Sequence, residues 1–473
     1  MPVNPADSEV FGTLYGSDAM RAIFDDRAYL GRMLAVEAAL ARVEARLGII
    51  PAAAAERIAE AAAAGPLETA SLAASVRKVG YPVVGLVAGL SARAGEAGPG
   101  EAGGWTHWGA TTQDIMDTAL VLMVRDGLRL VREEVAAILR ALARQADAHR
   151  NSVMAGRTHL QQALPITFGL KCAIWMQPFL AHLVRLSELG PRVLCVQFGG
   201  AAGTLASLGA QGLAVMEGLA AELGLAAPLA PWHVTRDGFT EVVSVLGLVS
   251  GSLAKVATDV TLLAQSELAE LSEPYVLGRG ASSTMPQKRN PIASEYILAA
   301  SRMVQALAPV MMGAMAADHE RATGPWQAEL LALPQAFVLT HGALLHGRSI
   351  AEGMVVDAGR MRRNLAEGGG LILAEAVMMD LAPYLGRGEA HHVVARAASR
   401  AREAEITLAQ ALAAEPAVTA HLDEAAIGRL TDPANYLGSA SAFIDRVLAG
   451  ARTMMKDAAG TAQRGATCQR EAT

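Results

Sequence analysis

Residues 280–291 form a segment whose side chains are suited to binding carboxylates and moving protons. The segment reads GASSTMPQKRNP, so Ser282, Ser283, Lys288 and Asn290 fall between a glycine and a proline. Glycine loosens the backbone and proline removes a hydrogen-bond donor, which excludes a regular helix or strand here. A solvated polar loop is the alternative, but the density of donors and cations favours a functional site.

A second candidate site centres on His159, within GRTHLQQALP at residues 156–165. From spacing alone, His159 is a lone histidine before a predicted helix, and such a histidine is more often structural than catalytic. Glu295 follows Lys288 by seven positions, at the start of another predicted helix. An acid in a first helical turn also has a plain explanation, a favourable interaction with the helix dipole.

A third candidate site is THWGATTQD at residues 106–114, which precedes a long predicted helix. Thr111, Thr112 and Gln113 supply hydrogen-bond donors, and His107 lies just upstream. Asp114 can bind there or cap the helix, and the sequence does not decide between the two.

The composition indicates helices as the elements that must position these residues. The chain has 473 residues, is rich in alanine and leucine, and contains only 4% aromatic residues. Alanine and leucine favour helices, whereas aromatic and β-branched residues favour strands. A net charge of −6 argues against nucleic acid as the main partner. The three cysteines lack disulfide or metal spacing, which is typical of a reducing cytoplasm.

Apolar residues recur at helical spacing along much of the chain, which predicts long amphipathic helices. The predicted helices cover residues 26–47, 117–139, 167–189, 240–271 and 293–317, with Pro309 expected to kink or interrupt the last. Their polar stripes are thin, which favours oligomerisation through helices over a single monomeric core. The uncharged run 193–216 reads as a loop followed by a buried helix, so no membrane partner is predicted.

The three candidate segments resemble the signature regions of the fumarase/aspartase superfamily, which includes argininosuccinate lyase and adenylosuccinate lyase. The resemblance implies an all-α fold, with a long central helical bundle flanked by two smaller helical domains and assembled as a homotetramer. The implied domains are residues 1–115, 116–366 and 367–473, the last with a disordered tail beyond Asp457. It also implies active sites shared between subunits, a small dicarboxylate substrate, and no metal or organic cofactor.

The superfamily chemistry removes a proton next to a carboxylate and then expels a group from the adjacent carbon. The resemblance makes Ser282 the base and Lys288 the cation that stabilises its alkoxide. Asn290, Ser283 and Thr158 then bind carboxylates. His159 and Glu295 form a dyad on the side of the leaving group, because a carboxylate raises the pKa of an imidazole and fixes its tautomer.

The resemblance extends to other substrate contacts. Thr111, Thr112 and Gln113 match a carboxylate-binding segment, and His107 matches a substrate-contacting histidine of the adenylosuccinate lyases. Two further positions, Arg236 and Arg321, match arginines that bind anionic substrate groups. A structural ion pair is the alternative for each arginine.

Three phrases, LPITFGLK at 164–171, QFGGA at 197–201 and AEGM at 351–354, resemble the 3-carboxy-cis,cis-muconate cycloisomerases. Bacterial members of that branch carry nonpolar residues at the two dyad positions, whereas this chain has His159 and Glu295. The combination predicts β-elimination from a substituted succinate to give fumarate, with nitrosuccinate, which releases nitrous acid, as the favoured substrate. A cycloisomerase of aromatic catabolism is the first alternative. An inactive structural or binding protein on the same fold is the second.

Overall fold

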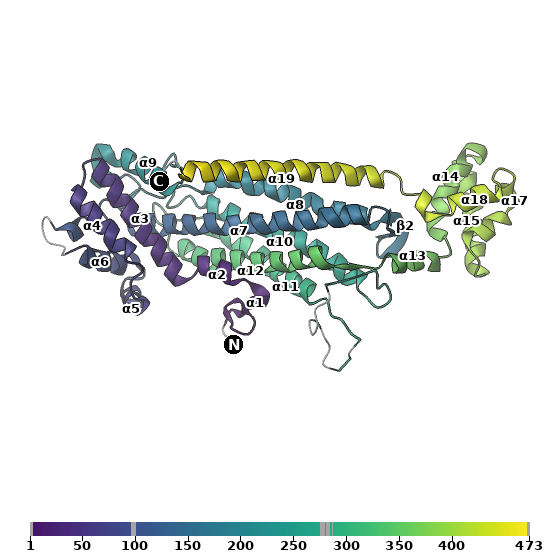
Figure 1. Ribbon diagram of the computed structural model, residues 1–473, viewed down its shortest axis with the longest axis horizontal. Helices are drawn as coiled ribbons and strands as arrows, with labels where there is room; N and C mark the ends of the chain where they lie inside the picture. The colour runs from purple at the N-terminus through teal and green to yellow at the C-terminus, as the bar shows by residue number, and fades with distance from the viewer. Residues whose placement is uncertain (1–2, 96–100, 275–279, 281–283, 286, 471–473) are drawn as a thin grey trace. The chain divides into compact units, whose positions relative to one another are not determined.

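The structure is a computed structural model (Figure 1) that describes residues 3–95, 101–274, 280, 284–285 and 287–470. The described chain is mostly helical, which confirms the predicted all-α class. Its strands form two small antiparallel sheets of two strands each. Contacts divide the chain into two compact units, and each unit is built from three separate segments. The three-domain division therefore stays a prediction.

Unit 1 consists of Met1–Val135, His182–Leu253 and Tyr296–Leu345. Its shorter elements are η1 (Pro5–Asp7), α1 (Gly12–Tyr15), α2 (Asp18–Ile23), α3 (Asp26–Arg46), α4 (Ala52–Ala63), α5 (Thr69–Val79), α6 (Val83–Ala94), η2 (Ala102–Trp105), η3 (Ala206–Gln211) and α9 (Gly212–Leu223). Asp25 caps α3 by accepting a hydrogen bond from the backbone N–H of Ala28. Helix α3 then packs on α4 and α9 and buries an apolar face that includes Met33 and Val36.

Five long helices contribute to both units: α7 (Thr112–Ala148), α8 (Phe168–Val193), α10 (Asp237–Leu263), α11 (Ile292–Ala314) and α12 (Pro325–Gly353). Four of them match the sequence predictions, although α10 ends at Leu263 rather than near residue 271. Helix α12 was not predicted, and it continues through Pro334, as α11 continues through Pro309. The run 193–216 is a loop followed by η3 and α9, as predicted.

Three helices, α10, α11 and α12, are long and apolar enough to cross a membrane by length and composition alone. Within the chain, 61% of the most apolar window of α10 and 67% of that of α12 is buried, against 33% for α11. Of these three helices, α11 therefore leaves the largest share of its apolar window exposed on the chain.

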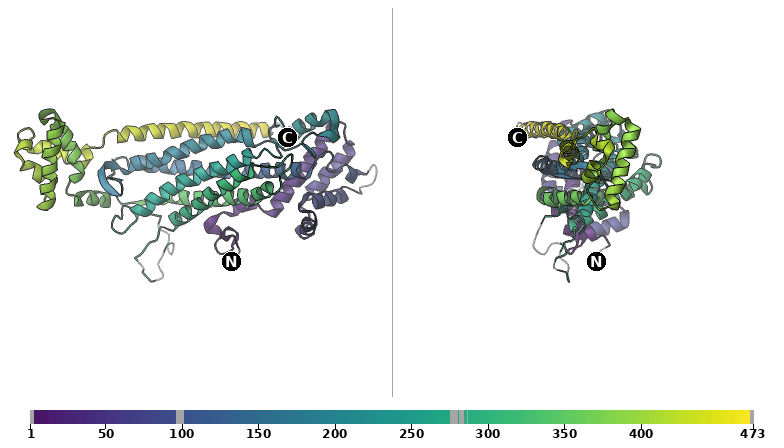
Figure 2. Two further views of the ribbon diagram at one scale, coloured as in Figure 1. Left: turned by 180° about the vertical axis from the view of Figure 1, so that it is seen from behind. Right: turned by 90° about the vertical axis from the view of Figure 1, so that its right-hand side faces the viewer.

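Unit 2 consists of Ala136–Ala181, Ala254–Glu295 and His346–Thr473. Its further elements are β1 (Val153–Thr158), β2 (Gln161–Thr167), β3 (Leu271–Ser272), β4 (Val355–Val356), α13 (Ala358–Glu367), η4 (Leu371–Leu373), α14 (Ala374–Leu385), α15 (Arg387–Glu403), α16 (Leu408–Ala413), α17 (Pro416–Thr419), α18 (Glu424–Leu430), η5 (Pro433–Asn435) and α19 (Ala440–Arg470). Helices α14–α18 pack around one apolar core and form the green and yellow group in Figure 2.

Helix α19 continues through Arg470, and the disordered tail beyond Asp457 stays a prediction. The segment is rich in alanine, and alanine has the highest intrinsic helix propensity.

Candidate active site

The hairpin of β1 and β2 carries His159 at its tip. Thr158 pairs with Gln161, so His159 and Leu160 are the two turn residues, with φ of 52° and 63°. A two-residue hairpin turn of type I′ requires positive φ at both positions, which costs a residue other than glycine roughly 1–2 kcal/mol. The expected position of His159 directly before a helix is therefore wrong, and the turn instead presents both side chains to solvent.

A buried ion pair fixes the base of this hairpin. The Arg157 guanidinium donates to both carboxylate oxygens of Glu270, at 2.9 and 2.7 Å. The Glu270 side chain is fully buried and also accepts from the Asn364 side chain at 2.8 Å. Gln162 donates to the backbone carbonyl of Asn364 at 3.0 Å. The hairpin that carries Thr158 and His159 is thereby joined to the strand that leads into the 280–291 segment.

Glu273 fastens the two ends of the segment that contains residues 280–291. Its carboxylate accepts hydrogen bonds from the backbone N–H groups of Ala293 and Ser294, at 3.0 and 2.7 Å, and from the Ser294 hydroxyl. These N–H groups lie in the first turn of α11, where a carboxylate also interacts favourably with the helix dipole. The Asn290 N–H donates to the Gly280 carbonyl at 3.1 Å.

A cavity of about 830 Å³ in unit 2 is lined by Lys288, Asn290 and Glu295. The structure therefore brings together three of the residues that the sequence predicted for one site. Ser282 and Ser283, the predicted base and its neighbour, lie outside the described residues. Among the described residues, no group of three His, Cys, Asp or Glu side chains could hold a metal ion.

The predicted dyad is not formed within one chain. His159 is exposed at the hairpin tip, and Glu295 is exposed in the first turn of α11. Within the part of the chain that the structure describes, no hydrogen bond or ion pair joins the two side chains. Their pairing stays a prediction.

Thr111 and Arg321 meet in unit 1. Nη1 of Arg321 donates to the Thr111 hydroxyl at 3.4 Å, and Nη2 donates to the Ala201 carbonyl at 2.9 Å. Arg321 thus joins the turn before α7 to the last residue of QFGGA. Thr112 is the first residue of α7 and is half-buried. A hydroxyl beside a half-buried guanidinium is a suitable place for an anionic group.

Gln113 and Asp114 have structural roles, because both side chains are fully buried. The Gln113 amide donates to Asp117 at 3.0 Å and to the His233 carbonyl at 2.9 Å, so the expectation that it binds substrate lacks support. Asp114 accepts from the Thr111 N–H at 3.0 Å, as the acid of a capping box does. It also accepts from His233 Nε2 at 2.7 Å and from two backbone N–H groups of the QFGGA loop.

Arg236 forms a structural ion pair, which was the alternative to substrate binding for this residue. The residue is 2% exposed, and its guanidinium donates to Asp117 at 2.6 and 3.2 Å and to both carboxylate oxygens of Glu329. Trp232 and Phe239 cover the guanidinium. Two carboxylates therefore occupy the donors that a substrate anion would need, and the substrate-binding role predicted for Arg236 loses its basis.

His107 has a buried partner that the sequence did not reveal. Its Nδ1 lies 2.6 Å from a carboxylate oxygen of Glu37, whose side chain is 1% exposed. Burial lowers the pKa of His107, but the charge and hydrogen bond of Glu37, together with Asp114, outweigh burial and raise that pKa overall. His107 also has φ of 61°, an uncommon backbone conformation for histidine. Strain of this kind tends to persist where the surroundings enforce it for function.

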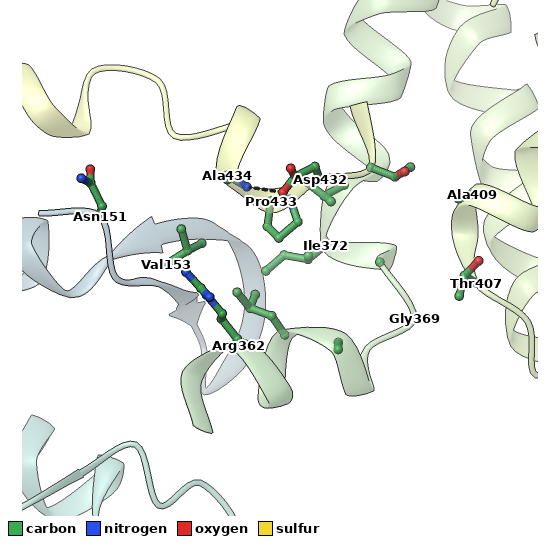
Figure 3. A pocket seen from close by; sticks show the side chains of 15 residues that line it. Asn151, Val153, Arg362, Gly369, Ile372, Thr407, Ala409, Asp432, Pro433 and Ala434 are labelled. Carbon is green, nitrogen blue, oxygen red and sulfur yellow. Dashed lines mark hydrogen bonds between the residues drawn. The ribbon is translucent and has the colours of Figure 1, made fainter. Parts of the chain in front are cut away.

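A second cavity, of about 660 Å³, lies in unit 2 away from the predicted site residues (Figure 3). Val153 of β1 and Ile372 supply apolar surface, and Arg362 supplies a cation. The Asp432 side chain at its rim is engaged in accepting from the Ala434 N–H at 2.9 Å, drawn as a dashed line in Figure 3. Among the described residues, none of those predicted for catalysis or substrate binding lines this cavity.

Comparisons with known proteins agree with these motifs. The family model described as Lyase matches residues 14–306, and one described as adenylosuccinate lyase C-terminus matches residues 370–447. The chain belongs to the fumarase/aspartase superfamily. It is therefore a lyase-superfamily enzyme, as the signature segments predicted.

Within the superfamily, the chain is 46% identical to a 3-carboxy-cis,cis-muconate cycloisomerase of Pseudomonas aeruginosa, over 93% of this chain and 96% of the relative. It is 39% identical to a nitrosuccinate lyase of Streptomyces davaonensis, over 94% and 95%. The crystal structure of 3-carboxy-cis,cis-muconate lactonizing enzyme from Pseudomonas putida superposes with a TM-score of 0.89, at 42% identity, and the match covers 95% of this chain and all of that one.

These similarities favour the cycloisomerase branch, which was the alternative in the sequence analysis, over the nitrosuccinate lyase that was preferred there.

Sequence reasoning missed three acids that organise the superfamily motifs: Glu37, Glu270 and Glu273. The helical pattern of residues 26–47 assigns Glu37 and Glu44 to the polar side of the predicted helix, and this assignment is wrong, because each is 1% exposed. Glu270 and Glu273 lie in what was predicted as helix or connector, so their partners could not be inferred.

Proposed function

We propose that this lyase makes and breaks a bond at the carbon next to the acidic C–H of a small polycarboxylate. Ser282 moves the proton, and Lys288 and Asn290 stabilise the negative charge that spreads into the neighbouring carboxylate. The proposal is supported by the cavity that gathers Lys288, Asn290 and Glu295, because charge that develops on a carboxylate needs fixed donors and cations beside it.

We propose 3-carboxy-cis,cis-muconate as the substrate, on the basis of the 46% identity to a cycloisomerase over nearly the full length of both chains. Ring closure adds a carboxylate oxygen of the substrate to one alkene carbon and a proton to the next carbon. Run in reverse, it is a β-elimination in which the leaving group is an internal carboxylate. The superfamily machinery therefore suits either direction, and the weakly basic leaving group needs no separate acid.

A second candidate is β-elimination from a substituted succinate to give fumarate, with nitrosuccinate as the substrate. Two observations favour it. His159 lies at the tip of a fixed hairpin, and Glu295 lines the same cavity as Lys288 and Asn290 of the signature loop, which is the segment 280–291. Both groups serve the side of the leaving group. Nitrite and a carboxylate are both weakly basic leaving groups that need little help from an acid, so the identity of the released product, rather than the activity of His159→Gln, separates the two candidates.

We further propose that the active enzyme is a cytoplasmic homotetramer whose sites combine residues from separate chains. Helix α11 and the residue after it expose Met303, Val310, Met312 and Met315, between 42% and 56% each. Exposed apolar side chains along a long helix are suitable contacts for another copy of the same chain. Sedimentation at several protein concentrations tests this assembly.

The test of function supplies purified protein with 3-carboxy-cis,cis-muconate and, separately, with nitrosuccinate. Loss of the diene absorbance with formation of the lactone supports the first proposal, and release of nitrite with fumarate supports the second. Ser282→Ala serves as the control, because its loss of turnover excludes a contaminating enzyme. Wild-type protein that folds and assembles but turns over neither compound contradicts both proposed substrates.

A further inference from the structure

Glu37, Glu44 and His107 form a buried titratable cluster in unit 1 that the proposed chemistry does not use. Glu37 and Glu44 lie two turns apart on α3, and each is 1% exposed. Within the described part of the chain, neither carboxylate oxygen of Glu44 has a hydrogen-bond partner, and Oε2 of Glu37 has none. A charged carboxylate without a partner is strongly disfavoured in such a place, so the cluster must distribute its protons unequally.

Charge balance decides where the protons lie. Burial and the nearby charge of Glu37 raise the pKa of Glu44 to about 9, so Glu44 is neutral at pH 7. Glu37 instead has a cationic partner available, because His107 Nδ1 lies at 2.6 Å from its Oε1. The other charged group that acts on His107 is Asp114 on α7, which His233 Nε2 and two backbone N–H groups already engage.

We propose that Glu37 is a positioning residue that holds His107 as an imidazolium, with Nδ1–H fixed on Glu37 and Nε2–H free to donate to an anionic group of the substrate. The imidazole is 20% exposed, so one edge of the ring reaches solvent while the other is held. His107 and Thr111 flank a turn closed by the hydrogen bond from the Ala110 N–H to the His107 carbonyl. Thr111 in turn contacts Arg321.

The inference rests on the proposed function and narrows its substrate class. Arg321 contacts the Thr111 hydroxyl, and His107 lies at the other end of the same turn, so unit 1 offers two cations beside one turn. A substrate that pairs with both sets of donors, those of His107 and those of Arg321, carries at least two anionic groups, as a polycarboxylate does. A monocarboxylate would leave one set of donors unpaired.

The experiment measures the charge of His107 directly, in full-length protein labelled with ¹³C at the histidine Cε1. Spectra of His107→Gln assign the His107 signal. In the wild type we expect the imidazole to titrate above its ordinary pKa of about 6.5. In Glu37→Gln, which keeps size and hydrogen bonding but removes the charge, we expect it to titrate below that value, because burial then dominates. Glu37→Asp retains the charge and is expected to restore most of the shift.

Function is read separately from titration. Addition of succinate, a dicarboxylate that cannot react, is expected to shift the wild-type His107 signal and to leave that of Glu37→Gln unmoved at pH 8. With a turned-over substrate, the fall of kcat/KM at high pH is expected to move to lower pH in Glu37→Gln, chiefly through KM. If no substrate is found, the succinate response still tests the inference. A wild-type His107 that is neutral at pH 7, or a titration unaffected by Glu37→Gln, overturns it.

Discussion

Glu44→Gln removes the most strongly perturbed acid of the buried cluster and changes the pH dependence of stability. Glu44 is neutral in the folded chain up to a pKa of about 9, whereas an unfolded glutamate ionises near its ordinary value of 4.5. Between those two values the folded state binds one proton more than the unfolded state. Folding stability from this group is therefore fully present below pH 4.5 and is lost as pH rises toward 9.

The expected change in folding stability follows from the one additional proton that the folded chain binds between these two pKa values. Each pH unit in that window is worth about 1.4 kcal/mol, so the wild type loses about 4 kcal/mol relative to Glu44→Gln between about pH 5.5 and pH 8.5. Unfolding entropy of about 2 cal/mol/K per residue converts 1 kcal/mol to about 1 °C for a chain of this length. The difference in Tm between the two proteins is thus expected to change by about 4 °C over that range.

Scanning calorimetry at fixed scan rate measures how the difference in Tm between the wild type and Glu44→Gln changes with pH. Any constant cost of burying the glutamine amide is the same at every pH and cancels in this comparison. Glu217→Gln is the matched control, since Glu217 is exposed on α9 of the same unit. Its Tm difference from the wild type is expected to be small and independent of pH. A Glu44→Gln difference that is equally flat would refute the reasoning, because it would mean that Glu44 has the same charge in the folded and unfolded chains.

Three further predictions concern the supports of the site. Arg236→Met leaves Asp117 and Glu329 buried without a cation and is expected to destabilise the fold by about 3–5 kcal/mol, measured as a fall in Tm that Arg236→Lys only partly avoids. Glu273→Ala removes the acceptor for the backbone N–H groups in the first turn of α11 and is expected to cost about 1 kcal/mol of stability. It is also expected to lower kcat at least severalfold, and an unchanged kcat would show that this cap does not influence the signature loop. Leu160→Gly relieves a positive φ and is expected to raise Tm by about 1 °C, whereas a fall in Tm would show that the exposed leucine packs on another copy of the chain.

Local patterns were sufficient for most of the fold. Helices α3, α7, α8 and α11 follow from apolar residues at helical spacing, and that signal survives without knowledge of any long-range contact. The same reasoning failed at His159, because the hairpin turn there contains neither glycine nor asparagine, the residues that normally indicate positive φ. The tertiary structure holds a conformation that the local sequence disfavours.

The partners of buried charges were beyond the sequence for a different reason. His107 and Glu37 are 70 residues apart, and Arg236 and Asp117 are 119 apart. Nothing in the local pattern of either residue indicates which distant acid it meets. Arg236 and Arg321 therefore looked equivalent in the sequence, and only the buried carboxylates around Arg236 separate a structural arginine from one that remains near the predicted site.

The central claim, that this lyase transfers a proton at the carbon beside a substrate carboxylate, is tested most directly by turnover in D₂O. With 3-carboxy-cis,cis-muconate, the account predicts a lactone that carries one deuterium at that carbon, on a single face, and no product from Ser282→Ala. Mass spectrometry and proton NMR of the product measure both. A lactone formed without deuterium, or formed equally well by Ser282→Ala, would contradict the claim.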